Sequence, residues 1–312
     1  MVDLMLPNRV VDGAAHPTAR RQFGRRANKA SGTKHASRMK IKSKDESKNA
    51  LGSVAWGESS KGVLNEDEKI RVVDNLKFVM SQEQIDADRR RLGLLNPKYI
   101  PVETLTPPDS QIANDALAYA EETHVAPLLR HSWRTYYFGA LIASHDGIEF
   151  DRELGFTAAI LHDLGLTASA NPRPCDCCFA VGGALQAREF LLSKGHSREH
   201  GDAVAHAISV HMNIHVPVEE HGALAFLVTR GAVCDVFGAG VSRTSSESIR
   251  QVLVKYSRGD LYAALRPAGC QHLAGTRIDV LLSFEASLNA GGHRPQNPLD
   301  SFTPGNFLKR VP

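Results

Sequence analysis

Residues 127–145 read PLLRHSWRTYYFGALIASH, and this stretch decides the fold. Pro127 suits the first turn of a helix, because its ring fixes a helical φ and its missing N–H would find no partner there. Side chains suited to a core then recur at helical spacing along two lines. The first line is Leu129, Trp133, Tyr136, Ala140 and Ala143, and the second is Leu128, Thr135, Phe138 and Ile142. A helix that is apolar on two faces needs neighbours on both, so the stretch predicts the central helix of a bundle.

Helical patterns continue on both sides of this stretch, and no long alternating pattern typical of a β-strand occurs. They cover approximately residues 109–124, 151–164, 179–194, 197–215, 221–237, 246–256 and 271–290. Several of them are followed by a glycine, the residue that most readily adopts the left-handed conformation of a helix end. The sequence therefore predicts an all-α fold with connections short enough for a packed bundle.

Composition divides the chain into four predicted regions. Residues 1–62 are rich in Arg, Lys, Ser and Gly and lack a sustained apolar period, which predicts a disordered basic tail. Residues 63–106 predict a charged helical arm and a proline-rich linker, residues 107–290 the helical domain, and residues 291–312 a C-terminal tail. An organellar presequence, or an upstream start that overstates the coding region, would also fit the N-terminal tail.

The formal net charge of +3 is the sum of a strongly positive N-terminal segment and a mildly negative remainder of the chain. Residues 1–44 contain 11 of the 37 Lys and Arg but 2 of the 34 acidic residues, so the rest of the chain is mildly acidic. Because the excess of basic over acidic residues lies outside the predicted domain, we expect no nucleic-acid partner. No apolar run approaches the roughly 18 residues that span a bilayer, and the N-terminus lacks the apolar core of a secretion signal. We therefore expect no membrane partner.

The cysteines favour a reducing compartment. Three of the five are crowded at Cys175, Cys177 and Cys178, unlike the evenly spread pattern of a disulfide scaffold. Such a group could bind an ion, but it lacks a matching second half, and we favour a loop at the mouth of a pocket. We expect a cytoplasmic protein that acts on a small-molecule substrate, and a homo-oligomer stays open.

Two histidines and two aspartates stand in apolar surroundings on three predicted helices. His131 lies on the second line of the central helix, His162 and Asp163 end another helix, and Asp235 ends a third within GAVCDVFG at 231–238. A buried imidazole or carboxylate needs a hydrogen-bond partner, an opposite charge or a metal. For each residue alone, a backbone bond, a helix cap or an arginine is an ordinary explanation. Together the four favour a metal site, whose nitrogen and carboxylate ligands suit zinc, iron or manganese.

The order of these residues resembles a known family. A His, then a His-Asp pair, then an Asp on successive helices resembles the HD-domain superfamily of metal-dependent hydrolases. Five motifs are similar, in order, to its cyanamide hydratase-like branch: HSWRTYYF at 131–138, LHDLG at 161–165, FAVGGA at 179–184, AISVH at 207–211 and DVFG at 235–238. The resemblance covers about residues 107–290 and implies an all-α HD domain there.

The resemblance also implies a divalent metal, with zinc favoured and iron or manganese as alternatives. Its ligands would be His131, His162, Asp163 and Asp235. Cyanamide hydratases add water to the nitrile carbon of cyanamide and release urea, a reaction for which a metal lowers the pKa of its water. We expect Asp163 to be both a ligand and the acceptor of the proton of that water.

Three further residues receive predicted roles at this site. His211 is our candidate for carrying a proton to the nitrile nitrogen or orienting the substrate. Arg134 and Phe138, on the helix of His131, are the predicted substrate-binding residues. An equally good account makes Arg134 a structural partner of a carboxylate ligand.

One position departs from the pattern of the branch. An acidic residue usually stands between the Phe and Val of the FAVGGA motif, and this chain has Ala180 there. If that acid contacts the substrate or a supporting histidine, the substrate of this chain differs or its activity is weak. A non-enzymatic binding protein that kept the fold is therefore one alternative function.

Two enzymatic alternatives keep the fold and change the reaction. A phosphohydrolase acting on a nucleotide or another phosphate ester would use Arg130 or Arg134 to hold the phosphate. An oxygenase with two irons would need His206, His211 or His215 as added ligands.

Overall fold

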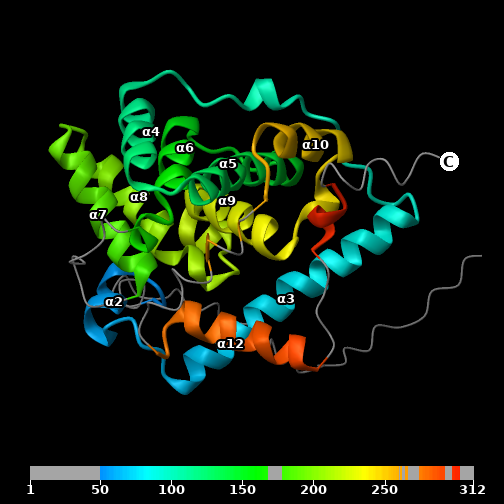
Figure 1. The fold of residues 1–312 in the computed structure, drawn as a ribbon, viewed down its shortest axis with the longest axis horizontal. Helices are drawn as coiled ribbons and strands as arrows, with labels where there is room; N and C mark the ends of the chain where they lie inside the picture. Colours follow the sequence, from blue (N-terminus) through cyan, green and yellow to red (C-terminus); the bar gives the residue numbers. More distant parts are fainter. Residues whose placement is uncertain are drawn as a thin grey trace, which may run out of the picture. The chain divides into compact units, whose positions relative to one another are not determined.

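The computed structural model describes residues 50–167, 178–259, 261, 264–265, 274–291 and 297–302, which belong to one unit of the chain, Lys42–Pro312 (Figure 1). These residues form helices and no β-strand, which confirms the predicted all-α fold. The α-helices are α2 (Val54–Ser60), α3 (Glu66–Arg91), α4 (Gln111–Thr123), α5 (Ala126–Asp146), α6 (Arg152–Leu161), α7 (Phe179–Ser193), α8 (Arg198–Val210), α9 (Val218–Phe237), α10 (Ser246–Lys255) and α12 (Arg277–Ala290). Short 3-10 turns are η1 (Val102–Leu105), η2 (Leu164–Leu166), η4 (His211–Asn213), η5 (Val241–Arg243) and η6 (Pro298–Phe302). None of the described helices combines the length and the apolar character needed to span a bilayer.

Helix α5 lies at the centre of the fold, as its two apolar lines predict. Pro127 stands in its first turn, and Gly147 ends it in the left-handed conformation with φ 71°. Tyr136, Phe138 and Ile142 are completely buried in the main core. The helix packs against α6 and along α9 (Figure 1).

Two glycines bring the backbones of α5 and α9 into direct contact. A Cβ at Gly139 would overlap the carbonyl oxygen of Leu227, and a Cβ at Gly231 would overlap that of Thr135. Only glycine fits at such a close approach of two backbones. His131 precedes Thr135 by one turn and Asp235 follows Gly231 by one turn, so this contact brings two predicted site residues next to each other.

The predicted helical arm is helix α3, which packs on the main body. Asn65 and Glu68 form a capping box at its start, and acidic residues fill the first turn and arginines the last, which matches the helix dipole. The buried carboxylate of Glu83 accepts hydrogen bonds from the backbone N–H groups of Gly240 and Ser242. A second group of buried apolar residues joins α2, α3 and α12 to α7 and α9.

Both predicted tails contain folded residues, and this corrects their predicted limits. Residues 1–49 lie outside the described residues, but residues 50–62 contain α2, where Trp56 is 5% exposed. The guanidinium of Arg277 lies 5.2 Å from the centre of the Trp56 ring. At the other end, Leu299 is completely buried within the predicted C-terminal tail. Composition could not reveal these contacts, because they join segments that are far apart in the sequence.

Candidate metal site

The end of α6 directs His162 and Asp163 toward one point. The helix ends at Leu161, His162 keeps a helical backbone, and Asp163 leaves it with φ −101° and ψ 14°. Neighbouring residues of a continuous helix point about 100° apart, so the change of direction at Asp163 lets both side chains approach one position. The two residues thus stand at the end of a helix, as the sequence predicts. Gly165 continues the turn against α7, where a Cβ would overlap the carbonyl oxygen of Phe179.

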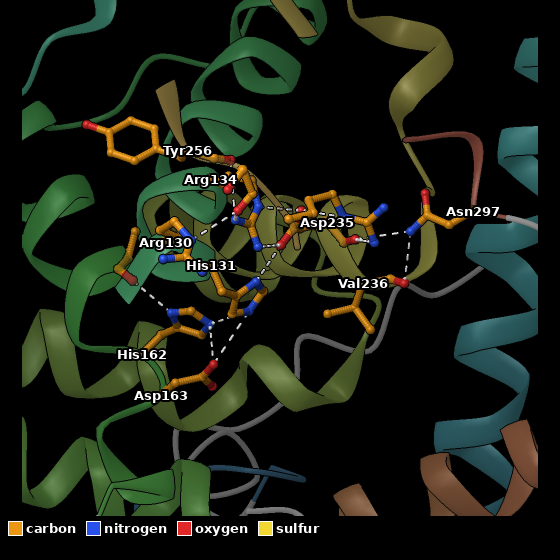
Figure 2. A network of polar contacts seen from close by, with 12 residues as sticks. Arg130, His131, Arg134, His162, Asp163, Asp235, Val236, Tyr256 and Asn297 are labelled. Atoms are coloured by element: carbon orange, nitrogen blue, oxygen red, sulfur yellow. Dashed lines mark hydrogen bonds and ion pairs between the residues drawn. The ribbon is translucent and has the colours of Figure 1, made fainter. Parts of the chain in front are cut away.

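Three side-chain atoms converge between α5 and the end of α6 (Figure 2). His131 Nε2 lies 3.2 Å from His162 Nε2 and 3.5 Å from Asp163 Oδ2. His162 Nε2 lies 3.3 Å from the same carboxylate oxygen. All three residues are buried. Among the described residues, these three form the one group of three or more His, Cys, Asp or Glu side chains whose atoms lie close enough together to bind the same metal ion.

Hydrogen bonds on the other side of each ring leave Nε2 facing the cluster. His162 Nδ1 lies 2.7 Å from the carbonyl oxygen of Ala159, which only accepts, so this nitrogen carries the proton. His131 Nδ1 likewise donates to Asp235 Oδ2 at 2.7 Å. Burial lowers the pKa of His162, so its Nε2 presents a lone pair to the cluster. Two Nε2 lone pairs at this distance repel each other unless a proton or a cation lies between them.

The third atom favours a cation. Asp163 Oδ2 is buried and accepts no hydrogen bond from any described residue, and a proton between the histidines would not change that. Burial opposes ionisation of Asp163, but His162 and His131 outweigh it and lower its pKa. Ligands bound at about 2.0–2.1 Å in a tetrahedron lie about 3.3 Å apart, close to the separations observed. These residues therefore fit a small divalent metal, with room for further ligands.

His211 completes the polar surroundings of Asp163. It ends α8 earlier than the pattern over 197–215 indicated, at the start of η4. Its Nδ1 donates to the carbonyl oxygen of Ile208 at 2.6 Å, and its Nε2 lies 3.9 Å from Asp163 Oδ1. Burial lowers the pKa of His211 to about 3, so the ring is neutral at pH 7 and Nε2 offers a lone pair to a hydrogen-bond donor or a ligand.

Asp235 lies behind His131, outside the group of converging atoms (Figure 2). Its carboxylate accepts two hydrogen bonds from Arg134, each of 2.8 Å, in addition to the bond from His131 Nδ1. Burial opposes its ionisation, but Arg134 and His131 outweigh that and hold its pKa well below the usual value. Three members of the predicted ligand set are thus brought together, and the fourth fixes the orientation of one of them.

The segment that holds this arrangement is similar to known proteins. Residues 128–230 match the HD domain family. The match spans α5 to α9 and includes all three converging residues. The chain is also 28% identical over 117 residues to two proteins of Saccharomyces cerevisiae, "Cyanamide hydratase DDI2" and "Cyanamide hydratase DDI3". The aligned part is 36% of this chain and 52% of each relative, so the chain spans about half the length of these curated relatives.

The two predicted substrate-binding residues lie away from the cluster's cavity. Arg134 is completely buried, and besides Asp235 it donates from Nη1 to the carbonyl oxygen of Ser257 at 2.7 Å. Phe138 is part of the main core, and neither residue lines the cavity beside the cluster. Their positions do not support substrate contact. The alternative account of Arg134, as the structural partner of a carboxylate, describes its contacts.

The second metal set considered for an oxygenase does not assemble among the described residues. The ring of His206 stacks with His221 at 5.5 Å between centres, and His215 packs on Phe78 at 4.8 Å. Neither histidine joins His211 beside Asp163 in the described structure. Cys175 and Cys177 lie outside the described residues, whereas Cys178 is buried and its Sγ accepts a hydrogen bond from Arg277 at 2.9 Å. Ala180 is completely buried among apolar residues.

A cavity of about 110 Å³ opens onto the cluster of His131, His162 and Asp163. The three converging side chains and His211 line it together with apolar residues from α9 and α12 and from the turn after α8. Sequence reasoning missed the cavity residues of α12, because nothing in that segment alone indicates which helix it covers. It also missed His124, which is buried, and whose pKa burial lowers to about 4 beside the cluster.

Proposed function

We infer that this protein is a metal-dependent hydratase that adds water to a small, neutral nitrile-type substrate, with conversion of cyanamide to urea as the reference reaction. The observation that carries the proposal is the convergence of His131 Nε2, His162 Nε2 and Asp163 Oδ2 at the end of a cavity. The similarity to two yeast cyanamide hydratases supports the choice of reaction. Zinc is the proposed metal because it suits two imidazoles and a carboxylate, and iron or manganese are the alternatives.

The residues of the chain divide the work of such a reaction. When bound, a divalent metal would lower the pKa of water and polarise the nitrile. His131, His162 and Asp163 would hold it, while Asp235 keeps the proton of His131 on Nδ1. The lowered pKa of His211 makes it a weak base, so we assign its neutral Nε2, 3.9 Å from Asp163 Oδ1, the second of its predicted roles, which is to orient the substrate or its water by accepting a hydrogen bond.

The charges around the cavity favour a neutral substrate over a phosphate ester. Arg134 is held by Asp235, and Arg130 donates from Nε to the carbonyl oxygen of Ser257 at 3.2 Å. No described Lys or Arg lines the cavity, whereas Glu285 does and would repel an anion. Phosphohydrolases commonly hold phosphate with arginine forks, and this cavity offers none among its described residues.

The test combines metal analysis with one reaction. Purified protein is analysed for metals and then assayed for urea release from cyanamide, with and without prior treatment with a chelator. We expect about one zinc per chain, and activity that chelation removes and added zinc restores. Asp163→Ala should lose both metal and activity while keeping a helical circular dichroism spectrum.

Asp202→Ala serves as the matched control, because Asp202 lies on α8 and pairs with Arg188 away from the cluster. This variant should keep wild-type metal content and activity. Urea release that is unchanged in Asp163→Ala would overturn the site. A metal-loaded protein that cleaves phosphate esters and leaves cyanamide unchanged would favour the phosphohydrolase, and one that retains no metal would favour the binding protein.

A further inference from the structure

The described lining of the cavity combines a few polar residues with many apolar ones. The polar residues are His131, His162, Asp163, His211 and Glu285, the last of which lies on α12. The apolar residues include Ile214 and Phe237 and three residues of α12. A substrate whose nitrile reaches the cluster would therefore place the rest of its atoms against hydrocarbon.

Helix α12 contributes apolar residues to the lining, although it lies outside the segment that matches the HD domain family. Ile278, Leu281 and Leu282 line the cavity. Ile278 and Leu281 are also buried in the second apolar core, which α12 shares with α3 (Figure 1). At the start of α12, Arg277 is completely buried and donates to Asn213 Oδ1 at 2.8 Å. Helix α12 is thus anchored at both the turn after α8 and the helical arm.

The size of the cavity exceeds that of cyanamide. An apolar protein cavity of about 150 Å³ holds a benzene ring, so one of about 110 Å³ has room for roughly four or five non-hydrogen atoms. Cyanamide has three. Against Leu281 and Ile278 an alkyl group would gain from leaving water, and the amino group of cyanamide would not.

We propose that α12 makes the site selective for nitriles that carry a compact branched alkyl group, of which isobutyronitrile is the representative, over smaller or more polar ones. This inference rests on the proposed function. In the reaction, the oxygen of water forms a bond to the nitrile carbon. The carbon–nitrogen triple bond becomes the carbon–nitrogen bond of an amide, and both protons of water end on nitrogen. The product is the corresponding amide, and no oxidant or reductant is needed.

The experiment compares two nitriles with similar reacting groups. The ratio of kcat/KM for isobutyronitrile to that for acetonitrile is measured on the zinc-loaded protein. Each buried methyl group favours binding about fourfold, so two more should raise the ratio to about 15. Leu281→Ser should lower the ratio severalfold. Leu288→Ser is the matched control, since Leu288 lies on the same helix outside the cavity lining and should leave the ratio unchanged.

Binding gives a second readout that does not depend on turnover. Calorimetry with the amide products should show tighter binding of isobutyramide than of acetamide, by a factor that also falls in Leu281→Ser. If this variant does not fold by circular dichroism, Leu282→Ser replaces it, because Leu282 lines the cavity but is only partly buried.

The outcomes separate this inference from the proposed function. A raised ratio that falls with the α12 variants supports the selectivity. Hydration of cyanamide together with equal or no hydration of the two alkyl nitriles would overturn the selectivity and leave the proposed function standing. Failure to hydrate cyanamide and both nitriles, with metal bound, would overturn the proposed function and the selectivity with it.

Discussion

Replacing Asp235 with Asn removes the charge that Arg134 and His131 share while keeping nearly the same shape. The native carboxylate accepts two hydrogen bonds of 2.8 Å from Arg134 and one of 2.7 Å from His131. Asn has a single oxygen and an NH2 group, so one of these donors would face another donor. Removing one partner of a buried ion pair costs about 3–5 kcal/mol, and we expect the free energy of unfolding to fall by that amount. Urea-induced unfolding of the metal-free protein, followed by circular dichroism, measures it.

The same substitution should weaken metal binding through the tautomer of His131. If the NH2 group of Asn faces Nδ1, the ring proton moves to Nε2, the atom that faces the cluster. Loss of such a supporting partner lowers metal affinity about 10–100-fold, and competition with a coloured chelator measures the change for zinc. Asp202→Asn, which breaks an exposed ion pair with Arg188, is the control and should cost less than about 1 kcal/mol.

A double variant separates the two effects. Arg134→Leu combined with Asp235→Asn removes the two charges of this pair, while Arg258, whose Nε lies 3.3 Å from Asp235 Oδ1, keeps its own. Part of the lost stability should therefore return while zinc affinity stays low. The reasoning is refuted if Asp235→Asn unfolds at the same urea concentration as the wild type and binds zinc with unchanged affinity.

The pH dependence of stability has a definite sign. Because the folded pKa of Asp235 is lowered, its contribution to stability is present above about pH 4 and is lost in stronger acid.

The remaining predictions concern acid stability, helix contact and the helical arm. The pKa of His124 is lowered to about 4 from 6.5, so the unfolded chain binds one more proton between these values and stability falls as the pH is lowered through that window. His124→Gln should reduce the slope of the free energy of unfolding against pH by about 1.4 kcal/mol per pH unit, as measured by urea titrations from pH 7 to 4. Gly231→Ala should lower the melting temperature strongly, because its Cβ would overlap the carbonyl oxygen of Thr135, whereas Gly182→Ala on α7 meets no atom within 4 Å and should leave melting unchanged or raise it slightly. Glu83→Gln should lower the free energy of unfolding in urea by about 1–3 kcal/mol, because the carboxamide of Gln offers one acceptor oxygen to Gly240 and Ser242 where the carboxylate offers two. Equal stability of the variant would contradict this role of Glu83.

Polar residues on apolar helix faces were the most informative feature of the sequence. His131 and the pair His162–Asp163 could be predicted as a site, because an unpartnered polar group is costly in a core and their helical spacing places them there. The same reasoning located Asp235 in the core but left its partner open. A carboxylate can be satisfied by a metal or by an arginine, and local sequence does not distinguish the two.

Residues on the central helix illustrate the limit of periodicity. The pattern in 127–145 indicates that Phe138 faces the interior, but it does not show what lies opposite Phe138 or which group Arg134 meets. In the structure Arg134 meets Asp235 and Phe138 meets the main core. Neither reaches the cavity, so substrate contact could not be judged from one helix alone.

The sequence by itself determined the all-α fold, the central helix and a set of four buried polar residues that contains the three converging ones. Helical periodicity and the cost of burying polar groups act over a few neighbouring residues, so a local pattern reveals them. Only the tertiary structure decided that Asp235 turns to Arg134, that residues 50–62 and 297–302 are part of the folded body, and that α12 contributes to the lining of the cavity. These features depend on which surfaces meet across long separations in the chain. That choice is made by packing of the whole core rather than by any local pattern.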